Sequence, residues 1–220
     1  MNKQNGILLL KKIITLMIGL TIAHLGCTLF IQSALGNDPY NVLIQGLFRS
    51  LQSATGWAFL THGRVHIAIC FLIIIILLIL DRSYIKIGTI LCMIFGGPII
   101  DLFTMLLKDH LNEESAMPVR ILSLVIGCIV LAFGMSIVIK SDCGTGPNDL
   151  VSVVISDKLK KNFGIVRILV DLAFVVVGFL LSGVVGVGTI VCAFLVGPTA
   201  NLFLPRCERV IKRFYGPAQQ

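Results

Sequence analysis

The chain repeats its own pattern of small and helix-breaking residues, and this internal duplication limits the folds that it can adopt. At an interval of 108 positions, residues of the first half recur as the same type: Gly19, Gly26, Ser33, Gly36, Pro39 and Gly56 match Gly127, Gly134, Ser141, Gly144, Pro147 and Gly164. At an interval of 100 positions, Gly88, Thr89, Ile90, Cys92, Gly97, Pro98, Leu102 and Phe103 match Gly188, Thr189, Ile190, Cys192, Gly197, Pro198, Leu202 and Phe203. The chain therefore contains two copies of one unit, about residues 13–107 and about residues 119–204.

Each copy holds three apolar segments of about membrane length. The segments are Ile13–Ile31, Val65–Leu80, Ile85–Leu107, Val119–Ile139, Ile165–Leu181 and Val184–Leu204. A helix needs about 20 apolar residues to cross a bilayer, so we expect the shorter second and fifth segments to extend into flanking residues. Hydrophobic residues make up 56% of the chain and charged residues 13%, unlike a soluble domain. The sequence predicts an all-α, polytopic helical membrane protein that forms a single membrane domain over residues 1–220.

Three spans per copy would place the second copy upside down in the membrane relative to the first. Inverted repeats of this kind are common in small-solute carriers. With a cytoplasmic N-terminus, 14 of the 18 Lys and Arg residues fall inside and 4 fall outside, as the positive-inside rule requires. We therefore predict two inverted three-span repeats with both termini in the cytoplasm. The net charge of +7 is attributed to this orientation, and no nucleic-acid partner is expected.

A shorter segment follows the first span of each copy, at Tyr40–Leu51 and Asn148–Leu159. A proline in the first helical turn is typical of a helix start, and Asp38 or Asn37 in one copy and Thr145 in the other are the expected caps. About 12 residues cover roughly 18 Å, less than the 30 Å bilayer core. These helices are therefore predicted either to re-enter the membrane from one face or to lie along it.

Small residues and prolines within the spans predict close helix packing. Gly19 and Gly26, and likewise Gly127 and Gly134, share one helix face, where small residues let two backbones approach. The Gly-Pro pairs at 97–98 and 197–198 are expected to interrupt the third and sixth spans. The seven cysteines show no metal-ligand spacing, so no metal site and no disulfide framework are expected.

The starts of the two short helices form the candidate substrate site. If both helices re-enter, their N-termini approach each other from opposite faces, and a helix N-terminus attracts anionic groups. The alternative interpretation is a pair of capped turns at the membrane surface. The candidate substrate-binding residues are Ser33, Gly36, Asn37, Asp38, Asn41, Ser141, Gly144, Thr145, Asn148 and Asp149.

Polar residues within the spans are the candidates for ion coupling. An ionisable group at this depth is unfavourable by several kcal/mol unless it is paired or wet, so it indicates function. The alternative is a structural hydrogen bond. The ion-coupling candidates are Asp101, its repeat counterpart Asn201, Asp171 and His24.

The repeated S-x-x-G-x-x-P blocks at 33–39 and 141–147 and the G-T-x-x-C blocks at 88–92 and 188–192 resemble those of the YczE/YyaS/YitT-type bacterial integral membrane proteins. The similarity covers about residues 13–204. It implies a multi-pass protein of the bacterial plasma membrane, and it supplies no catalytic or binding residues to transfer.

The leading functional prediction is a small secondary carrier that works by alternating access. Its cargo would be a small anionic or zwitterionic solute, coupled to H⁺ or Na⁺. Two alternatives stay open: a solute-binding subunit of an energy-coupled importer, docking through the basic loop Lys158–Arg167, and a non-transporting membrane scaffold. The absence of a P-loop, HExxH or nucleophile-elbow motif leads us to expect neither an enzyme nor a cofactor. The lipid bilayer is an expected partner, and homodimerisation stays open.

Overall fold

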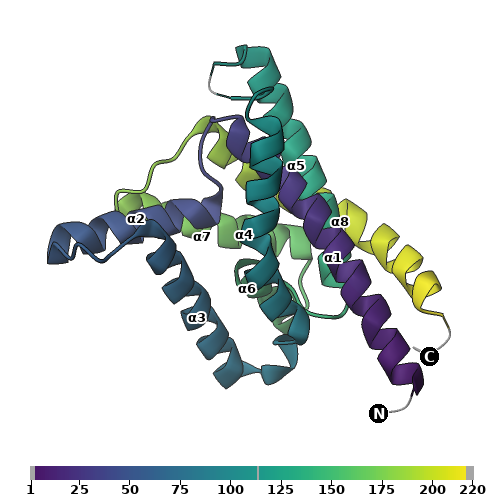
Figure 1. Ribbon diagram of the computed structural model, residues 1–220. Helices are drawn as coiled ribbons and strands as arrows, with labels where there is room; N and C mark the ends of the chain where they lie inside the picture. Colours follow the sequence, from purple (N-terminus) through teal and green to yellow (C-terminus); the bar gives the residue numbers. More distant parts are fainter. Residues whose placement is uncertain (1–2, 113, 217–220) are drawn as a thin grey trace.

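The computed structural model describes residues 3–112 and 114–216, and within these residues it is built from helices without a strand (Figure 1). The α-helices are α1 (Lys3–Gln32), α2 (Pro39–Thr55), α3 (His62–Leu80), α4 (Ile87–Leu107), α5 (Met117–Lys140), α6 (Pro147–Leu159), α7 (Phe163–Leu180) and α8 (Val187–Tyr215). A 3-10 turn, η1 (Arg82–Tyr84), joins α3 to α4. Six of these helices, α1, α3, α4, α5, α7 and α8, are long and apolar enough to cross a membrane. The prediction of an all-α polytopic helical protein is confirmed.

The helix boundaries confirm some sequence predictions and correct others. The second and fifth spans extend upstream to His62 and Phe163, as expected. The sixth span continues to Tyr215, well past the predicted end at Leu204. The expected interruptions at the Gly-Pro pairs are wrong, because α4 and α8 run continuously through Pro98 and Pro198. Membrane helices tolerate proline where neighbouring groups or local adjustments satisfy the freed carbonyl.

The centre of the fold is the crossing of α1 and α5, where glycines bring the two backbones together. A Cβ added at Gly127 would lie 2.8 Å from the carbonyl oxygen of Gly26, and one at Gly134 would lie 2.7 Å from that of Gly19. Residues later in α1 meet residues earlier in α5, so the two helices are antiparallel. The predicted role of these four glycines in helix packing is confirmed.

Within each copy, the first and third spans run in the same direction. In the first copy, Leu16 and His24 of α1 contact Gly88 and Gly96 of α4 in the same order. In the second copy, the Ser136 hydroxyl donates to the Ala200 carbonyl at 3.3 Å, and Lys140 pairs with Glu208 at 2.6 Å. Since α1 opposes α5, the first and third spans of one copy oppose those of the other.

The copies also exchange equivalent contacts through their loops. The Gly88 N–H donates to the Cys143 carbonyl at 2.7 Å, and the Gly188 N–H donates to the Leu35 carbonyl at 2.9 Å. Gly36 and Gly144, one residue further along each loop, have φ values of 147° and 115°, which disfavour a side chain. The two copies are therefore joined by the same bond made in both directions.

The loops gather at two opposite ends of the helices. At one end, Arg120 donates to the Ser33 carbonyl at 2.8 Å, and Arg49 donates to the Ser182 carbonyl at 2.9 Å. At the other end, which we call the basic end, Lys12 pairs with Asp142 at 2.6 Å. The basic end also holds both the first turns of α1 and the last turn of α8, because the Lys11 ammonium donates to the Phe214 carbonyl at 3.0 Å. The terminal residues 1–2 and 217–220 themselves lie outside the described residues.

The short helices α2 and α6 pack against spans of the bundle. Figure 1 shows α2 lying across the direction of α4. It contacts α7 closely, since a Cβ added at Gly178 would lie 2.6 Å from the Val42 carbonyl oxygen. The α6 helix contacts α3 and α7. Both short helices thus bring their N-termini close to the span that carries the charged groups described next.

Candidate functional site

A buried ion cluster joins α6 to α7. The Arg167 guanidinium donates through Nη1 to Asp149 Oδ1 at 2.6 Å and through Nε to Asp171 Oδ2 at 2.9 Å. The side chains of Asp171, Arg167 and Asp149 are 1%, 10% and 21% exposed. Buried charges of this kind are unfavourable unless they are paired, so their presence inside an apolar bundle indicates a functional site. We call Asp149, Arg167 and Asp171 the ion cluster.

Local helix geometry positions the ion cluster. Asp149 lies in the first turn of α6. Arg167 and Asp171 are four residues apart on the buried face of α7, so they face each other across one turn. The interpretation of Lys158–Arg167 as a basic surface loop is wrong for its last residue, because α7 already begins at Phe163. Sequence analysis did not predict this pairing, although the Arg-x-x-x-Asp spacing inside an apolar helix is a signal that could have indicated it.

Asp38 and His24 lie within electrostatic range of the ion cluster. The carboxylates of Asp38 and Asp149 both interact electrostatically with Asp171 and with Cys27 of α1. Asp149 also interacts with Arg167. Asp149 also acts on His24, whose Nδ1 is 2.7 Å from the Leu20 carbonyl oxygen. The starts of α2 and α6 therefore approach the same part of the bundle, and they bring together four of the predicted site residues.

The two short helices begin differently. Asp38 caps α2 as predicted, accepting from the Asn41 backbone N–H at 3.1 Å and from its side-chain amide at 2.5 Å. The predicted Thr145 cap is wrong, because the N-cap of α6 is Gly146 and no side chain caps this helix. Within the described residues, the buried Thr145 hydroxyl has no hydrogen-bond partner. The start of α6 is therefore open to an added acceptor group, whereas that of α2 already holds a carboxylate.

The region carries more negative than positive charge. Asp38, Asp149 and Asp171 contribute three carboxylates, and Arg167 contributes one guanidinium. The inner oxygen of Asp171, Oδ1, is buried and has no hydrogen-bond partner within the described residues. A buried unpaired oxygen is unfavourable, so a proton or a small cation would stabilise it. No group of three or more His, Cys, Asp or Glu side chains suited to a metal ion occurs in the described ranges.

Most other predicted site residues build the loops. The Ser33 and Ser141 hydroxyls donate to carbonyls of their own helices, those of Phe30 and Val138. Gly36 and Gly144 pack against Thr189 and Thr89, the second residues of the repeated Gly-Thr pairs. Asn37 donates weakly to Gln45 at 3.5 Å. These positions place the short helices and do not line the ion cluster.

The remaining candidates are not joined to the ion cluster by any contact that the structure shows. Asp101 is exposed on α4. Asn201 is half-buried on α8, where its Cβ lies beside Gly164. Asn148, half-buried in the first turn of α6, has an amide oxygen near Gly146. The proposed coupling role of Asp101 and Asn201 stays a prediction.

The copies differ in how tightly equivalent positions close. Gly164 and Gly197 pack together, since a Cβ at either would lie within 2.8 Å of the other's carbonyl oxygen. A Cβ at Gly63 or Gly97 would meet nothing within 4 Å. Gly97 is the repeat counterpart of Gly197, and Gly63 is the second residue of α3 as Gly164 is of α7, whereas Gly56, which the sequence repeat pairs with Gly164, is the C-cap of α2. Similarly, the Thr189 hydroxyl donates to the Asn37 carbonyl at 2.6 Å, whereas that of Thr89 has no partner in the described part of the chain. The second copy is therefore tightly packed between α7 and α8, which we call the closed side, and the first copy is loosely packed between α3 and α4, which we call the open side.

A polar cavity lies at the basic end. Its volume is about 510 Å³, and its lining includes Tyr84, Lys86, Asp142, Thr145 and Asp157. Burial raises the pKa of Asp142, but hydrogen bonds from Lys12 and Lys86 outweigh this effect and lower the pKa below its usual value. A carboxylate whose pKa is lowered by folding stabilises the folded state at any pH above its usual pKa. This stabilisation is lost as the pH falls through the lowered pKa. These ion pairs therefore persist at neutral pH.

Comparison with known proteins finds relatives that match most of the chain. Residues 10–205 match the model of a family of unknown function, DUF6198. The chain is 30% identical over 193 residues to "Uncharacterized protein YyaS" of Bacillus subtilis (strain 168), covering 87% of this chain and 92% of the relative. It is 29% identical over 194 residues to "Uncharacterized membrane protein YczE" of the same organism, covering 88% and 85%. An "Uncharacterized protein" of Haemophilus influenzae is 28% identical over 197 residues, covering 88% and 84%. No solved structure matches.

The resemblance to YczE/YyaS-type proteins is confirmed, and with its membrane-length helices the chain is a multi-pass membrane protein.

Proposed function

We propose that this chain, which belongs to the DUF6198 family of unknown function, is a small secondary carrier that moves a zwitterionic solute together with H⁺ or Na⁺. The observation that carries the proposal is the buried ion cluster of Asp149, Arg167 and Asp171 in the second copy, which interacts electrostatically with Asp38 of the first copy. The second copy is inverted relative to the first, and the protein lies in the bacterial plasma membrane with both ends of the chain in the cytoplasm.

The arrangement of charges supports a zwitterion over a simple anion. The uncapped start of α6, with the unpartnered Thr145 hydroxyl beside it, is suited to a carboxylate. The surplus of carboxylates around Arg167 is suited to an ammonium group and to a coupling cation. Asp171, whose inner oxygen lacks a partner within the described residues, is the group that we assign to coupling. This assignment narrows the cargo predicted from the sequence.

The helix directions support the inverted repeat. The parallel pairs α1–α4 and α5–α8 oppose each other, as two inverted units would. Lysines and arginines gather at the basic end, where α1 begins and α8 ends, which favours the cytoplasm for this end. Carriers built from inverted repeats bind their cargo between the halves, at helix starts like those of α2 and α6.

The unequal closure of the two copies supports alternating access. Gly164 of α7 and Gly197 of α8 are in contact, whereas the equivalent Gly63 of α3 and Gly97 of α4 are apart. In an inverted repeat, an exchange of these two arrangements between the copies opens the opposite side of the site. The polar cavity at the basic end would then be the cytoplasmic entrance.

The two rival functions have less support. A scaffold predicts that the polar residues at 38, 101, 149 and 171 are scattered. Asp38 and Asp149 both interact electrostatically with Asp171, and only Asp101, exposed on α4, lies apart from these three. A subunit of an energy-coupled importer would dock on its partner through the basic loop Lys158–Arg167. The burial of Arg167 removes one positive charge from that surface. We therefore retain the carrier as the proposed function.

The experiment is a ligand screen followed by uptake. The purified protein is heated with each member of a panel of amino acids, betaines and other small zwitterions. Ligand at 100 times its Kd stabilises the native state by about 2.7 kcal/mol, which raises the unfolding temperature. Each stabilising compound is then tested for uptake into proteoliposomes under a proton or sodium gradient. The proposal predicts at least one compound that stabilises the protein and accumulates only with a gradient.

Variants of the ion cluster make this test specific. Asp149→Asn and Asp171→Asn are expected to reduce gradient-driven uptake at least 100-fold, and Asp171→Asn is expected to abolish its pH or sodium dependence. Asp109→Asn changes an exposed carboxylate outside the spans and is the matched control. Unchanged uptake in both cluster variants would refute the site, and a panel without any stabilising compound would refute the carrier.

Gly97→Ala separates alternating access from simple binding. A methyl group at Gly97 meets nothing within 4 Å in the present conformation, so thermal stability is expected to stay equal or to rise slightly. If Gly97 packs against Gly63 in the alternate conformation, as Gly197 packs against Gly164, the same methyl group blocks that state. We expect uptake to fall at least tenfold while ligand-induced stabilisation persists. Undiminished uptake would contradict the exchange of conformations between the copies.

A further inference from the structure

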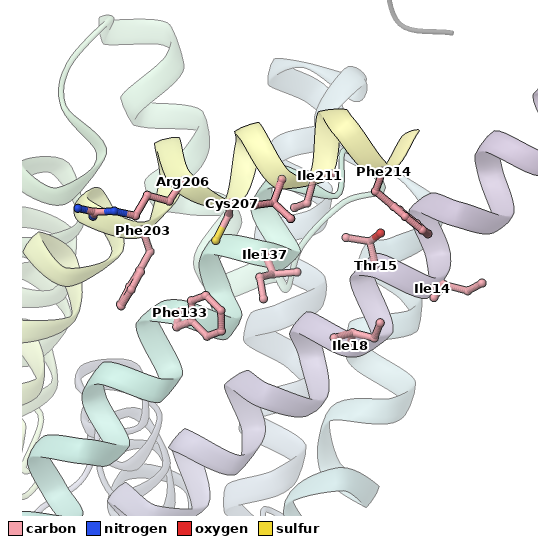
Figure 2. A pocket seen from close by; sticks show the side chains of 11 residues that line it. Ile14, Thr15, Ile18, Phe133, Ile137, Phe203, Arg206, Cys207, Ile211 and Phe214 are labelled. Carbon is pink, nitrogen blue, oxygen red and sulfur yellow. The ribbon is translucent and has the colours of Figure 1, made fainter. Parts of the chain in front are cut away.

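A second cavity, separate in its lining from the ion cluster, opens on the outer surface of the bundle. It is a groove of about 410 Å³ between α1, α5 and α8. Figure 2 shows Ile14 and Ile18 of α1, Phe133 and Ile137 of α5, and side chains of α8 facing one another across it. Several of its apolar side chains stay exposed, including Ile18 at 54% and Phe214 at 51%. The groove therefore presents an apolar surface that is open along its length.

The last part of α8 places basic residues at one edge of this groove. A helix of 29 residues extends about 44 Å, whereas the bilayer core is about 30 Å thick. The final turns of α8 therefore lie at the level of the lipid headgroups. Cys207, Ile211 and Tyr215 are buried against the bundle. The opposite face of this segment is exposed and carries Arg206, Arg209 and Arg213.

The basic charge at this edge is not neutralised by the protein. The Arg206 guanidinium lies at the edge of the groove and points away from its apolar side chains (Figure 2). Its hydrogen bond goes to the Leu202 carbonyl at 2.7 Å, and no acidic side chain of the described residues pairs with it. The neighbouring Glu208 is held by Lys140 and Lys212, both at 2.6 Å. An exposed arginine beside an apolar groove at headgroup level matches the two parts of an anionic lipid.

We propose that the groove between α1, α5 and α8 is a binding site for an anionic phospholipid. An acyl chain lies against Ile14, Ile18 and Phe133, and the phosphate is held by Arg206. Arg209 and Arg213 add attraction from the same face of α8. This site is independent of the proposed carrier function, because it shares no residue with the ion cluster.

Fluorescence quenching by brominated lipids tests the proposal in the full-length protein. The chain has one tryptophan, Trp57, which is replaced by phenylalanine. Phe214→Trp then places a reporter in the groove, and Phe71→Trp places a control reporter on the exposed surface of α3. The protein is reconstituted in vesicles of phosphatidylcholine containing one tenth brominated phosphatidylglycerol or one tenth brominated phosphatidylcholine.

At position 214, we expect brominated phosphatidylglycerol to quench at least three times more strongly than brominated phosphatidylcholine. At position 71, the two lipids are expected to quench equally. Arg206→Gln should remove the preference at position 214, Arg206→Lys should retain most of it, and high salt should weaken it. Equal quenching by both lipids at position 214, a preference that survives Arg206→Gln, or no quenching by either lipid would each overturn the proposal. The last result would mean that a second copy or another apolar ligand covers the groove.

Discussion

Replacing Arg167 with methionine is expected to lower the free energy of unfolding by about 3–5 kcal/mol. The substitution leaves Asp149 and Asp171 without their shared partner, and removing one member of a buried ion pair leaves an uncompensated charge. The change is measured by denaturant or thermal unfolding of the purified protein in detergent, followed by circular dichroism. It is the largest effect that the structure predicts for any single side chain.

Two comparison proteins separate this effect from the loss of any ion pair. Lys158→Met removes the exposed pair with Asp81, and exposed pairs contribute little, so no measurable change is expected. The triple variant Arg167→Met, Asp149→Asn, Asp171→Asn removes all the charges of the cluster and is expected to recover much of the lost stability. It should not recover uptake. If Arg167→Met were as stable as Lys158→Met, the cluster would not be buried and paired as described.

Gly26→Ala is expected to destabilise the protein by about 3 kcal/mol, the upper part of the usual range for an overpacked core. The added methyl group would overlap the Leu131 backbone, which belongs to the facing helix and has no rotamer with which to move aside. The same unfolding measurement applies.

The control for Gly26→Ala lies in the same helix. A Cβ at Gly6 meets nothing within 4 Å, so Gly6→Ala is expected to leave stability unchanged or to increase it by up to about 1 kcal/mol. Equal effects of the two substitutions would mean that α1 and α5 do not cross at Gly26.

Features that depend on residue type and spacing could be predicted from the sequence. The apolar segments predict the spans, and the glycines seven residues apart predict close helix packing, which occurs where α1 crosses α5. Asp38 and Asp149 are predicted as site residues because they lie at the starts of the short helices, and Asp171 because it is ionisable within an apolar span. The structure brings Asp38 and Asp149 into electrostatic range of Asp171.

Features that depend on tertiary partners could not be predicted in the same way. Arg167 falls both in the predicted apolar segment Ile165–Leu181 and in the basic loop Lys158–Arg167, and only its ion pairs with Asp149 and Asp171 show that its charge is buried. The Thr145 cap was wrong because a hydroxyl next to a helix start bonds only if the backbone turns it towards the free amides. The sequence repeat pairs Gly56 with Gly164, but Gly56 ends α2 and Gly63 is the residue of α3 that is equivalent to Gly164. The unequal packing of Gly63 and Gly164 could not be predicted, because identical residues in the two copies cannot specify which copy is closed.

The most direct test of the inverted arrangement is the accessibility of the ends of the two short helices. Ser53→Cys near the end of α2 and Lys160→Cys after α6 are made separately in a cysteine-free background, and both positions are exposed. Intact cells are treated with a membrane-impermeant maleimide before and after permeabilisation. We expect the cysteine at position 53 to react in intact cells and the cysteine at position 160 to react only after permeabilisation. Reaction of both positions from the same side would contradict the inverted repeat and the carrier mechanism built on it.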